Sequence, residues 1–269
     1  TDRPSQPKKT GEGCRFGISG RPGDIVWVID QWGCMSQEIA GVKQNMNNFA
    51  KSIAYAKNDY RVIVLAKRGT GSKDICIPPP LGGASCSDNT RFKQISVKVG
   101  STNELSLYMS YASKIEAFMR PTSLRQIVVV SDDNSSVSAA AFHAWAKKRP
   151  GYNDYIFHSI VSVKNDWCTA KVGSVYKDLT TWTKGSWFHI CNANWTQLFN
   201  TLGKTAGTIA MNKYKLKNTP VAGSIKVSYN GNPKTQGVHW DYDKANNQVI
   251  LKGQLPPQHA KILVCYMYN

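Results

Sequence analysis

The sequence is poor in acidic residues for its length. Only 17 Asp and Glu stand against 34 Lys and Arg among 269 residues, which leaves a formal net charge of +17. An excess of this size predicts anionic partners, such as nucleic acid, acidic polysaccharide, lipopolysaccharide or an acidic protein, and carries no information about the fold. A simpler alternative is that the excess only keeps the protein in solution.

Several motifs of known chemistry are missing. The sequence has no Cys-x-x-Cys, no Gly-x-Ser-x-Gly elbow, no Gly-rich phosphate loop and no nucleic-acid module of a known type. No apolar run is long enough to span a bilayer, and no signal peptide precedes the first strand. We therefore expect a non-enzymatic protein that binds no specific nucleic acid. It would be secreted, periplasmic or on the cell surface after removal of a leader.

A buried strand followed by an acidic residue, a turn and a helix is the most informative feature present. The run Ile25–Ile29 is continuously apolar, as in strands that helices cover on both faces. Asp30 follows it, and Gly33 allows a tight turn. The next apolar residues recur at spacings of three and four, which predicts a helix: Ile39, Val42, Met46, Phe49 and Ile53.

A second strand of the same kind is predicted at Gln126–Ser131. It ends on Asp132 and Asp133, and a helical pattern begins near Ser136. Because open α/β folds place their ligands at the carboxyl ends of the strands, two strands that both end on Asp indicate a shared site. The simpler interpretation is that these residues are helix caps or turn formers.

The string Asp30-Gln31-Trp32-Gly33-Cys34-Met35 resembles the start of the von Willebrand factor A (VWA) domain. That family has Asp-x-Ser-Gly-Ser after its first apolar strand. Thr102, in the segment Val99–Leu105, corresponds to the family's later Thr, and Asp132 to its later Asp. The resemblance covers about residues 24–204. It implies an α/β fold class. The domain would be a Rossmann-like, doubly wound VWA domain of the type found in bacterial surface adhesins.

The resemblance also implies a partner-binding site at Asp30, Trp32, Cys34, Thr102 and Asp132. In the family these positions form a metal-ion-dependent adhesion site that holds Mg²⁺ or Mn²⁺. Here Trp32 and Cys34 replace both serines, and neither offers the hard oxygen ligand that such ions prefer. We therefore expect a degenerate site without a cofactor. If Mg²⁺ or Mn²⁺ does bind, its ligands are Asp30, Thr102 and Asp132.

Trp32 has three possible environments. Its ring fills the space of the missing serine, stands exposed as an aromatic contact for a partner, or packs against the loop Arg68–Arg91. That loop is rich in Gly, Pro and Ser and longer than compact domains usually need, which predicts a functional or crosslinked segment.

The chain is expected to divide into three parts. Residues 1–19 form a tail that can lend a strand to the last domain, residues 20–205 form the VWA-like domain, and residues 206–269 form a small all-β domain. The last part resembles the small β-sandwich that follows A domains in some bacterial surface proteins. The resemblance depends on a pattern of a strand, a turn at Asn230-Gly231, the segment Trp240-Asp241-Tyr242 and a further strand. The remaining expected strands are 60–66, 95–99, 155–162, 187–191, 224–229, 249–252 and 262–268, and the remaining helices are 104–118, 136–148, 173–183 and 194–202.

Seven cysteines indicate an oxidising compartment. Cys76 and Cys86 would close part of the long loop. Cys168 follows one expected strand and Cys191 ends the next, and the ends of these strands could be neighbours. Similar bacterial A domains have cysteines in these settings, which supports both pairs. Cys14–Cys265 would tie the chain ends together and leave Cys34 free. The five histidines, expected to be packed or surface residues rather than ligands, are His143, His158, His189, His239 and His259.

Three functions compete. The first is extracytoplasmic binding or adhesion to a protein or an anionic polysaccharide or lipopolysaccharide surface, through the top of the A-like domain. The second is a structural subunit of a surface or envelope assembly. The third is a hydrolase using Asp30, Asp132 or Cys34, which is disfavoured because a Cys nucleophile needs a nearby base such as His.

Overall fold

The chain forms two compact units in the computed structural model. One is Pro22–Thr208, and the other joins Thr1–Arg21 to Ile209–Asn269. The boundaries expected after residues 19 and 205 lie within three residues of these. The structure describes residues 11–18, 22–55, 60–121, 123–191, 194–197, 199–200, 202, 213–252 and 260–269.

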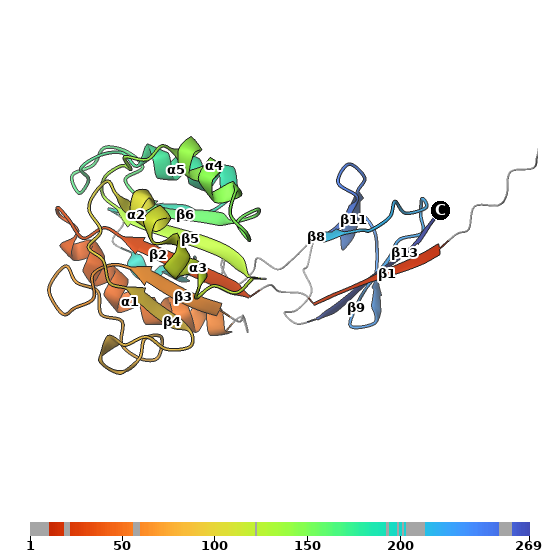
Figure 1. Cartoon of the computed structure of the whole chain (residues 1–269), viewed down its shortest axis with the longest axis horizontal. Helices are drawn as coiled ribbons and strands as arrows, with labels where there is room; N and C mark the ends of the chain where they lie inside the picture. The colour runs from red at the N-terminus through yellow and green to blue at the C-terminus, as the bar shows by residue number, and fades with distance from the viewer. Residues whose placement is uncertain are drawn as a thin grey trace, which may run out of the picture. The chain divides into compact units, whose positions relative to one another are not determined.

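The larger unit is built on a six-stranded sheet in which every neighbouring pair is parallel, as expected for the α/β class (Figure 1). The strand order is β4-β3-β2-β5-β6-β7. The strands are β2 (Gly23–Ile29), β3 (Tyr60–Leu65), β4 (Phe92–Ile95), β5 (Leu124–Ser131), β6 (Ile156–Val161) and β7 (Trp187–His189).

Helices cover both faces of this sheet. They are α1 (Ser36–Tyr55), α2 (Glu104–Ser110), α3 (Ala112–Glu116), α4 (Ala139–Lys147) and α5 (Ser174–Thr183). Trp27 packs in the α1 core beside Phe49 and Phe199, whereas its neighbours Val26 and Val28 belong to the core under the other four helices. Alternate residues from Ile25 to Ile29 therefore belong to opposite cores, which explains why this run is continuously apolar.

Two expected elements differ in the structure. The single helix expected at 104–118 is split at Tyr111 (φ −97°, ψ 8°) into α2 and α3, although the buried positions continue on one face. The strand expected at 95–99 is displaced to β4, which pairs with β3 only as far as Leu65 and Ile95. Beyond that point the chain leaves the sheet, and Val99 O accepts a hydrogen bond from Gln31 N.

The long loop is an ordered cover over the α1 core. Ile75, Ile77 and Leu81 are buried there, and Cys76 is bonded to Cys86. Asn47 of α1 accepts a hydrogen bond from the Leu81 amide and donates one to the Pro79 carbonyl. The loop thus replaces regular structure with side-chain anchors and a short crosslink.

The smaller unit contains two antiparallel sheets that share one core, an arrangement consistent with the expected β-sandwich. One sheet has the order β1-β13-β9-β10 and the other β11-β12-β8. The strands are β1 (Gly11–Ile18), β8 (Lys213–Lys215), β9 (Lys226–Tyr229), β10 (Asn232–Lys234), β11 (Trp240–Asp243), β12 (Gln248–Leu251) and β13 (Lys261–Tyr268).

The N-terminal segment pairs with the last strand of the chain. Cys14 lies opposite Cys265 in the β1–β13 register, and the two are disulfide-bonded with 4.1 Å between their Cα atoms. Residues 11–18 of the expected tail therefore form a strand of the last domain, in line with the expectation that the tail can lend one. Trp240 to Tyr242, expected between strands, lie in β11 because they pair with β12. Asn230 and Gly231, both with positive φ, form the tight turn from β9 to β10.

Candidate functional site

Asp30 and Asp132 lie at the carboxyl edge of adjacent strands. Asp30 follows β2 and Asp132 follows β5, and the Asp30 amide donates to Val130 O at 2.9 Å. The strand order reverses direction between β2 and β5, which makes this the topological switch point where open α/β sheets bind ligands. The two residues expected to meet at a site are thus brought together.

The repulsion between these two carboxyl groups is relieved in several ways. Asp30 accepts hydrogen bonds from Trp32 N at 2.8 Å and Ser131 Oγ at 3.2 Å. Burial raises the pKa of Asp30 from its ordinary value of 3.8 to about 7. Burial also raises the pKa of Asp132. Protonation of Asp30 removes one of the two charges and so relieves the repulsion between the two groups.

Two further carboxyl groups, not anticipated from the sequence, are buried near this pair. Glu38 is on α1, and its raised pKa comes mainly from burial with a contribution from Asp132. Glu104 opens α2, accepts a hydrogen bond from Tyr176 Oη at 2.6 Å, and has a pKa raised mainly by burial. Among the described residues, Glu38 Oε2 and Glu104 Oε1 have no hydrogen-bond partner. Four carboxyl groups are thus gathered under this edge of a strongly basic protein.

The long loop reaches the site through Lys73. Its ammonium donates to Gly33 O at 2.6 Å and lowers the pKa of Asp132 against the effect of burial. Gln31 fastens the same loop, since its amide donates to Lys73 O at 2.6 Å and its Oε1 accepts from Lys67 N at 2.7 Å. The loop is therefore part of the site.

Trp32 stands outward at this edge. Its side chain is 52% exposed, and the Lys98 ammonium lies 4.3 Å from the ring centroid. A Cβ added at Gly100 would lie 3.4 Å from the Trp32 ring, so the ring covers that glycine. Of the three environments considered for Trp32, the exposed one describes the ring best: half of its surface faces solvent, and it contacts Lys98 and Gly100.

The other two site residues of the resemblance are exposed. The Thr102 carbonyl accepts hydrogen bonds from Ser136 N and Ser136 Oγ, both at 2.9 Å, which ties this loop to the start of the α4 region. Cys34 is an exposed free thiol. Gly33, between Trp32 and Cys34, has φ +58°.

The side chains at this edge do not provide the oxygen ligands of the family's divalent-cation site. Asp30 and Asp132 supply oxygen atoms, but Trp32 points its ring away and Cys34 offers sulfur, so two of the five family ligands are lost. Asp30, Asp132 and either glutamate also do not bring three ligand atoms within 4.8 Å of one another in the part of the chain that the structure describes.

Exposed basic and aromatic side chains occupy loops that leave the same edge. We call these residues the basic-aromatic face: Trp32 after β2, Lys98 after β4, and Lys164, Trp167 and Lys171 after β6. Trp167 is 82% exposed. The backbone amides of Ala170 and Lys171 both donate to the backbone carbonyl of Asp132, so the loop after β6 is held beside the end of β5.

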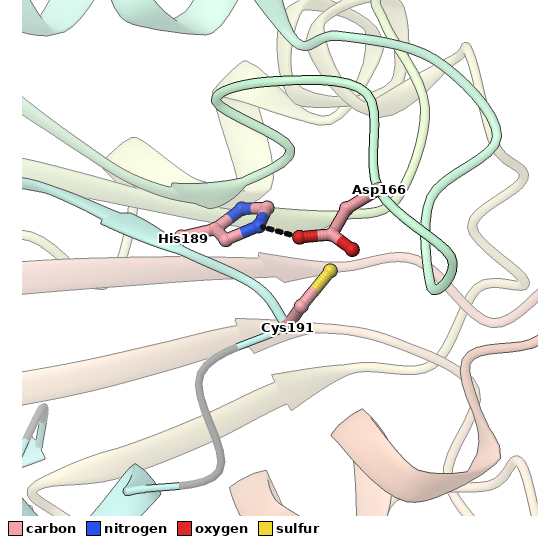
Figure 2. Close-up of side chains that lie close together, drawn as sticks. All are labelled: Asp166, His189 and Cys191. Carbon is pink, nitrogen blue, oxygen red and sulfur yellow. Dashed lines mark hydrogen bonds and ion pairs between the residues drawn. The ribbon is translucent and has the colours of Figure 1, made fainter.

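A second cluster, which sequence reasoning missed, lies where the loop after β6 meets β7. Asp166, His189 and Cys191 bring their ligand atoms within 4.8 Å of one another, and His189 Nε2 lies 3.0 Å from Asp166 Oδ2 (Figure 2). Cys191 is bonded to Cys168. The available signal was the pair of Asp-x-Cys and His-x-Cys spacings, which place a carboxylate and an imidazole two residues before Cys168 and Cys191.

The fold and the first site together define a parallel α/β domain with two carboxyl groups at its switch point, joined in sequence to a small antiparallel β unit. No helix in the described residues is both long enough and apolar enough to cross a membrane.

No protein-family model matches the chain, and neither does any curated protein. A solved structure, the pilus adhesin RrgA from Streptococcus pneumoniae, matches over 96% of this chain with 8% sequence identity and a TM-score of 0.36. The chain spans 58% of that adhesin's length. At this TM-score, nothing about the activity of this chain follows from the match.

Proposed function

We propose that this protein is an extracytoplasmic binding or adhesion module that recognises an anionic partner through the basic-aromatic face. The partner is an acidic polysaccharide, a lipopolysaccharide or an acidic protein surface. Binding proceeds without a metal ion, because the family ligands at positions 32 and 34 are absent. Three disulfides and the lack of a spanning helix in the described residues are compatible with a place outside the cytoplasm.

The observation that carries this proposal is the position of Trp32. A tryptophan ring more than half exposed is held over a lysine at the switch point of the sheet. Exposed aromatic side chains beside cations offer both a stacking surface and charge, the combination found in binding hot spots. Lys98, Lys164 and Lys171 add positive charge from other loops on the same edge.

A binding role fits the chain better than catalysis. The described histidines are engaged elsewhere: His143 with Tyr155, His158 with Gln126, His189 with Asp166 and His239 with the Thr235 amide. His259 lies outside the described residues. Cys34 therefore has no imidazole base among these four, and a thiol nucleophile requires one.

The proposal is tested with heparin, a sulfated polysaccharide, as the probe. We expect Trp32→Ala and Lys98→Ala each to weaken binding at least about fivefold, which corresponds to about 1 kcal/mol. Trp182→Ala is the matched control, because Trp182 is 49% exposed and lies near the end of α5. That end meets the start of β6 through the Phe157 N to Thr183 Oγ1 hydrogen bond, away from the carboxyl edge. Equal losses in all three variants would refute a role for this face.

A further inference from the structure

A disulfide and a hydrogen bond join the loop after β6 to the region of β7 at two adjacent points. The Cys168–Cys191 disulfide, with 5.8 Å between Cα atoms, joins this loop to the residue beyond β7. Beside it, His189 at the end of β7 is hydrogen-bonded to Asp166 in the same loop. In Figure 2 the Cys191 sulfur lies close to the Asp166 carboxylate and to the His189 ring.

We propose that these four residues form a redox-gated zinc site: the oxidised protein holds the disulfide, and the reduced protein binds one Zn²⁺. The ligands are the sulfurs of Cys168 and Cys191, one ring nitrogen of His189 and a carboxylate oxygen of Asp166. Two thiolates, an imidazole and a carboxylate are a donor set that suits four-coordinate zinc. The magnesium-type ions considered at Asp30 prefer oxygen ligands, so the two sites differ in the metal they would take.

The chemical steps balance. A dithiol reductant gives two electrons and two protons to the Cys168–Cys191 bond, which becomes two thiols while the reductant becomes a disulfide. Zn²⁺ then displaces one proton from each thiol as two Zn–S bonds form. The two states exclude each other, because a sulfur in the disulfide has no thiolate to offer the metal.

The geometry permits the change with small movements. Tetrahedral Zn–S bonds of about 2.3 Å place the two sulfurs about 3.8 Å apart, a separation that side-chain rotation supplies at the present Cα spacing. Asp166 and His189 are about one quarter exposed or less, so the site is partly shielded yet reachable. The competing cation is Lys164, whose ammonium is 3.7 Å from Asp166 and whose side chain is 70% exposed.

Zinc binding would break one weak hydrogen bond of the present structure. Val163 N lies 3.4 Å from His189 Nδ1, a long hydrogen bond that favours a proton on Nε2. Zinc at Nε2 moves that proton to Nδ1 and breaks this contact. The metal would replace the Asp166–His189 hydrogen bond with two coordinate bonds, so the loop stays clipped to β7 in both states.

The experiment measures zinc per chain and zinc affinity by competition with a colorimetric chelator. Native full-length protein is compared with protein reduced by a water-soluble phosphine, in which water supplies the oxygen for the phosphine oxide and the protons for the thiols. We expect one additional equivalent of tightly bound zinc after reduction. His189→Gln and Asp166→Asn should each weaken that binding at least about tenfold, whereas Cys76→Ser with Cys86→Ser should leave it unchanged.

Cys168→Ser provides a test without reductant. It frees the Cys191 thiol and leaves three protein ligands and one open position, so it should bind zinc in a non-reducing buffer, which wild type does not. Far-ultraviolet circular dichroism checks the fold of each sample. The proposal is overturned if folded reduced wild type and Cys168→Ser bind no more zinc than the native protein. It is also overturned if either loses its fold whenever the disulfide is absent, or if His189→Gln keeps the affinity. None of these outcomes bears on heparin binding by Trp32.

Discussion

At the scale of single residues, the buried carboxyl group of Asp30 makes the stability of the larger unit depend on pH. Its folded-state pKa of about 7 lies above the ordinary value of 3.8, so the folded state keeps its proton up to a higher pH than the unfolded chain does. The contribution of this protonated group to the free energy of unfolding is fully present below about pH 4 and is lost as pH rises through 7. His158 acts in the opposite direction, since burial lowers its pKa to about 4 and its contribution is lost as pH falls from 6.5.

Asp30→Asn isolates the first effect. Asparagine keeps an oxygen for the Trp32 amide and removes the titrating group. We expect the variant to be more stable than wild type at pH 8 by on the order of 2 kcal/mol, with the difference shrinking towards pH 4. Urea denaturation of both proteins across this pH range measures it. A difference that is constant with pH would contradict the raised pKa.

Restoring both serines tests the VWA resemblance at the same loop. Trp32→Ser with Cys34→Ser should create binding of Mg²⁺ or Mn²⁺ that is weak or missing in wild type, because it returns two oxygen ligands beside Asp30 and Asp132. Calorimetric titration measures the affinity, and each single variant serves as a control. Micromolar binding by wild type would refute a degenerate site, and no binding by the double variant would mean that the alignment of this loop is wrong.

At the scale of elements, the long loop depends on a crosslink as well as on packing. Cys76 and Cys86 are ten residues apart, and the segment between them has no regular structure beyond one short 3₁₀ turn at Ala84–Cys86. A loop of this length loses about 3 kcal/mol of unfolded-state entropy when it is closed. The same segment supplies Leu81 to the α1 core, while Lys73 just before it reaches Gly33.

Replacing both cysteines by serine should therefore lower the free energy of unfolding of the larger unit by about 3 kcal/mol. Chemical denaturation measures the loss, and non-reducing peptide mapping should recover Cys76 linked to Cys86 and Cys34 as a free thiol. Recovery of Cys76 and Cys86 as free thiols from native protein would contradict the crosslinked loop.

At the scale of the whole molecule, the β unit is assembled from the two ends of the chain. β1 pairs along its full length with β13, and Cys14–Cys265 spans 251 residues of sequence. The larger unit has its own cores and no residue in this crosslink. Loss of the disulfide should therefore act on the β unit alone.

Cys14→Ser with Cys265→Ser should reduce the stability of the β unit by up to about 5 kcal/mol and leave the parallel sheet unchanged. Hydrogen exchange read peptide by peptide separates the two, because protection should fall in β9, β12 and β13 and persist in β2 and β5. Equal loss in both units would mean that they do not unfold independently.

Local patterns in the sequence determined the parallel α/β class, the strands that deliver Asp30 and Asp132, helix α1 and the turn at Asn230-Gly231. Each depends on the period of apolar residues or on the backbone freedom of one or two residues, and both are properties of neighbouring positions. By contrast, only the tertiary structure decided that Glu104 meets Tyr176 and that Trp32 rests on Lys98. It also decided that Asp166, His189 and Cys191 converge. These groups are brought together by strand order and by loops that leave the sheet, and no local spacing encodes which loops become neighbours.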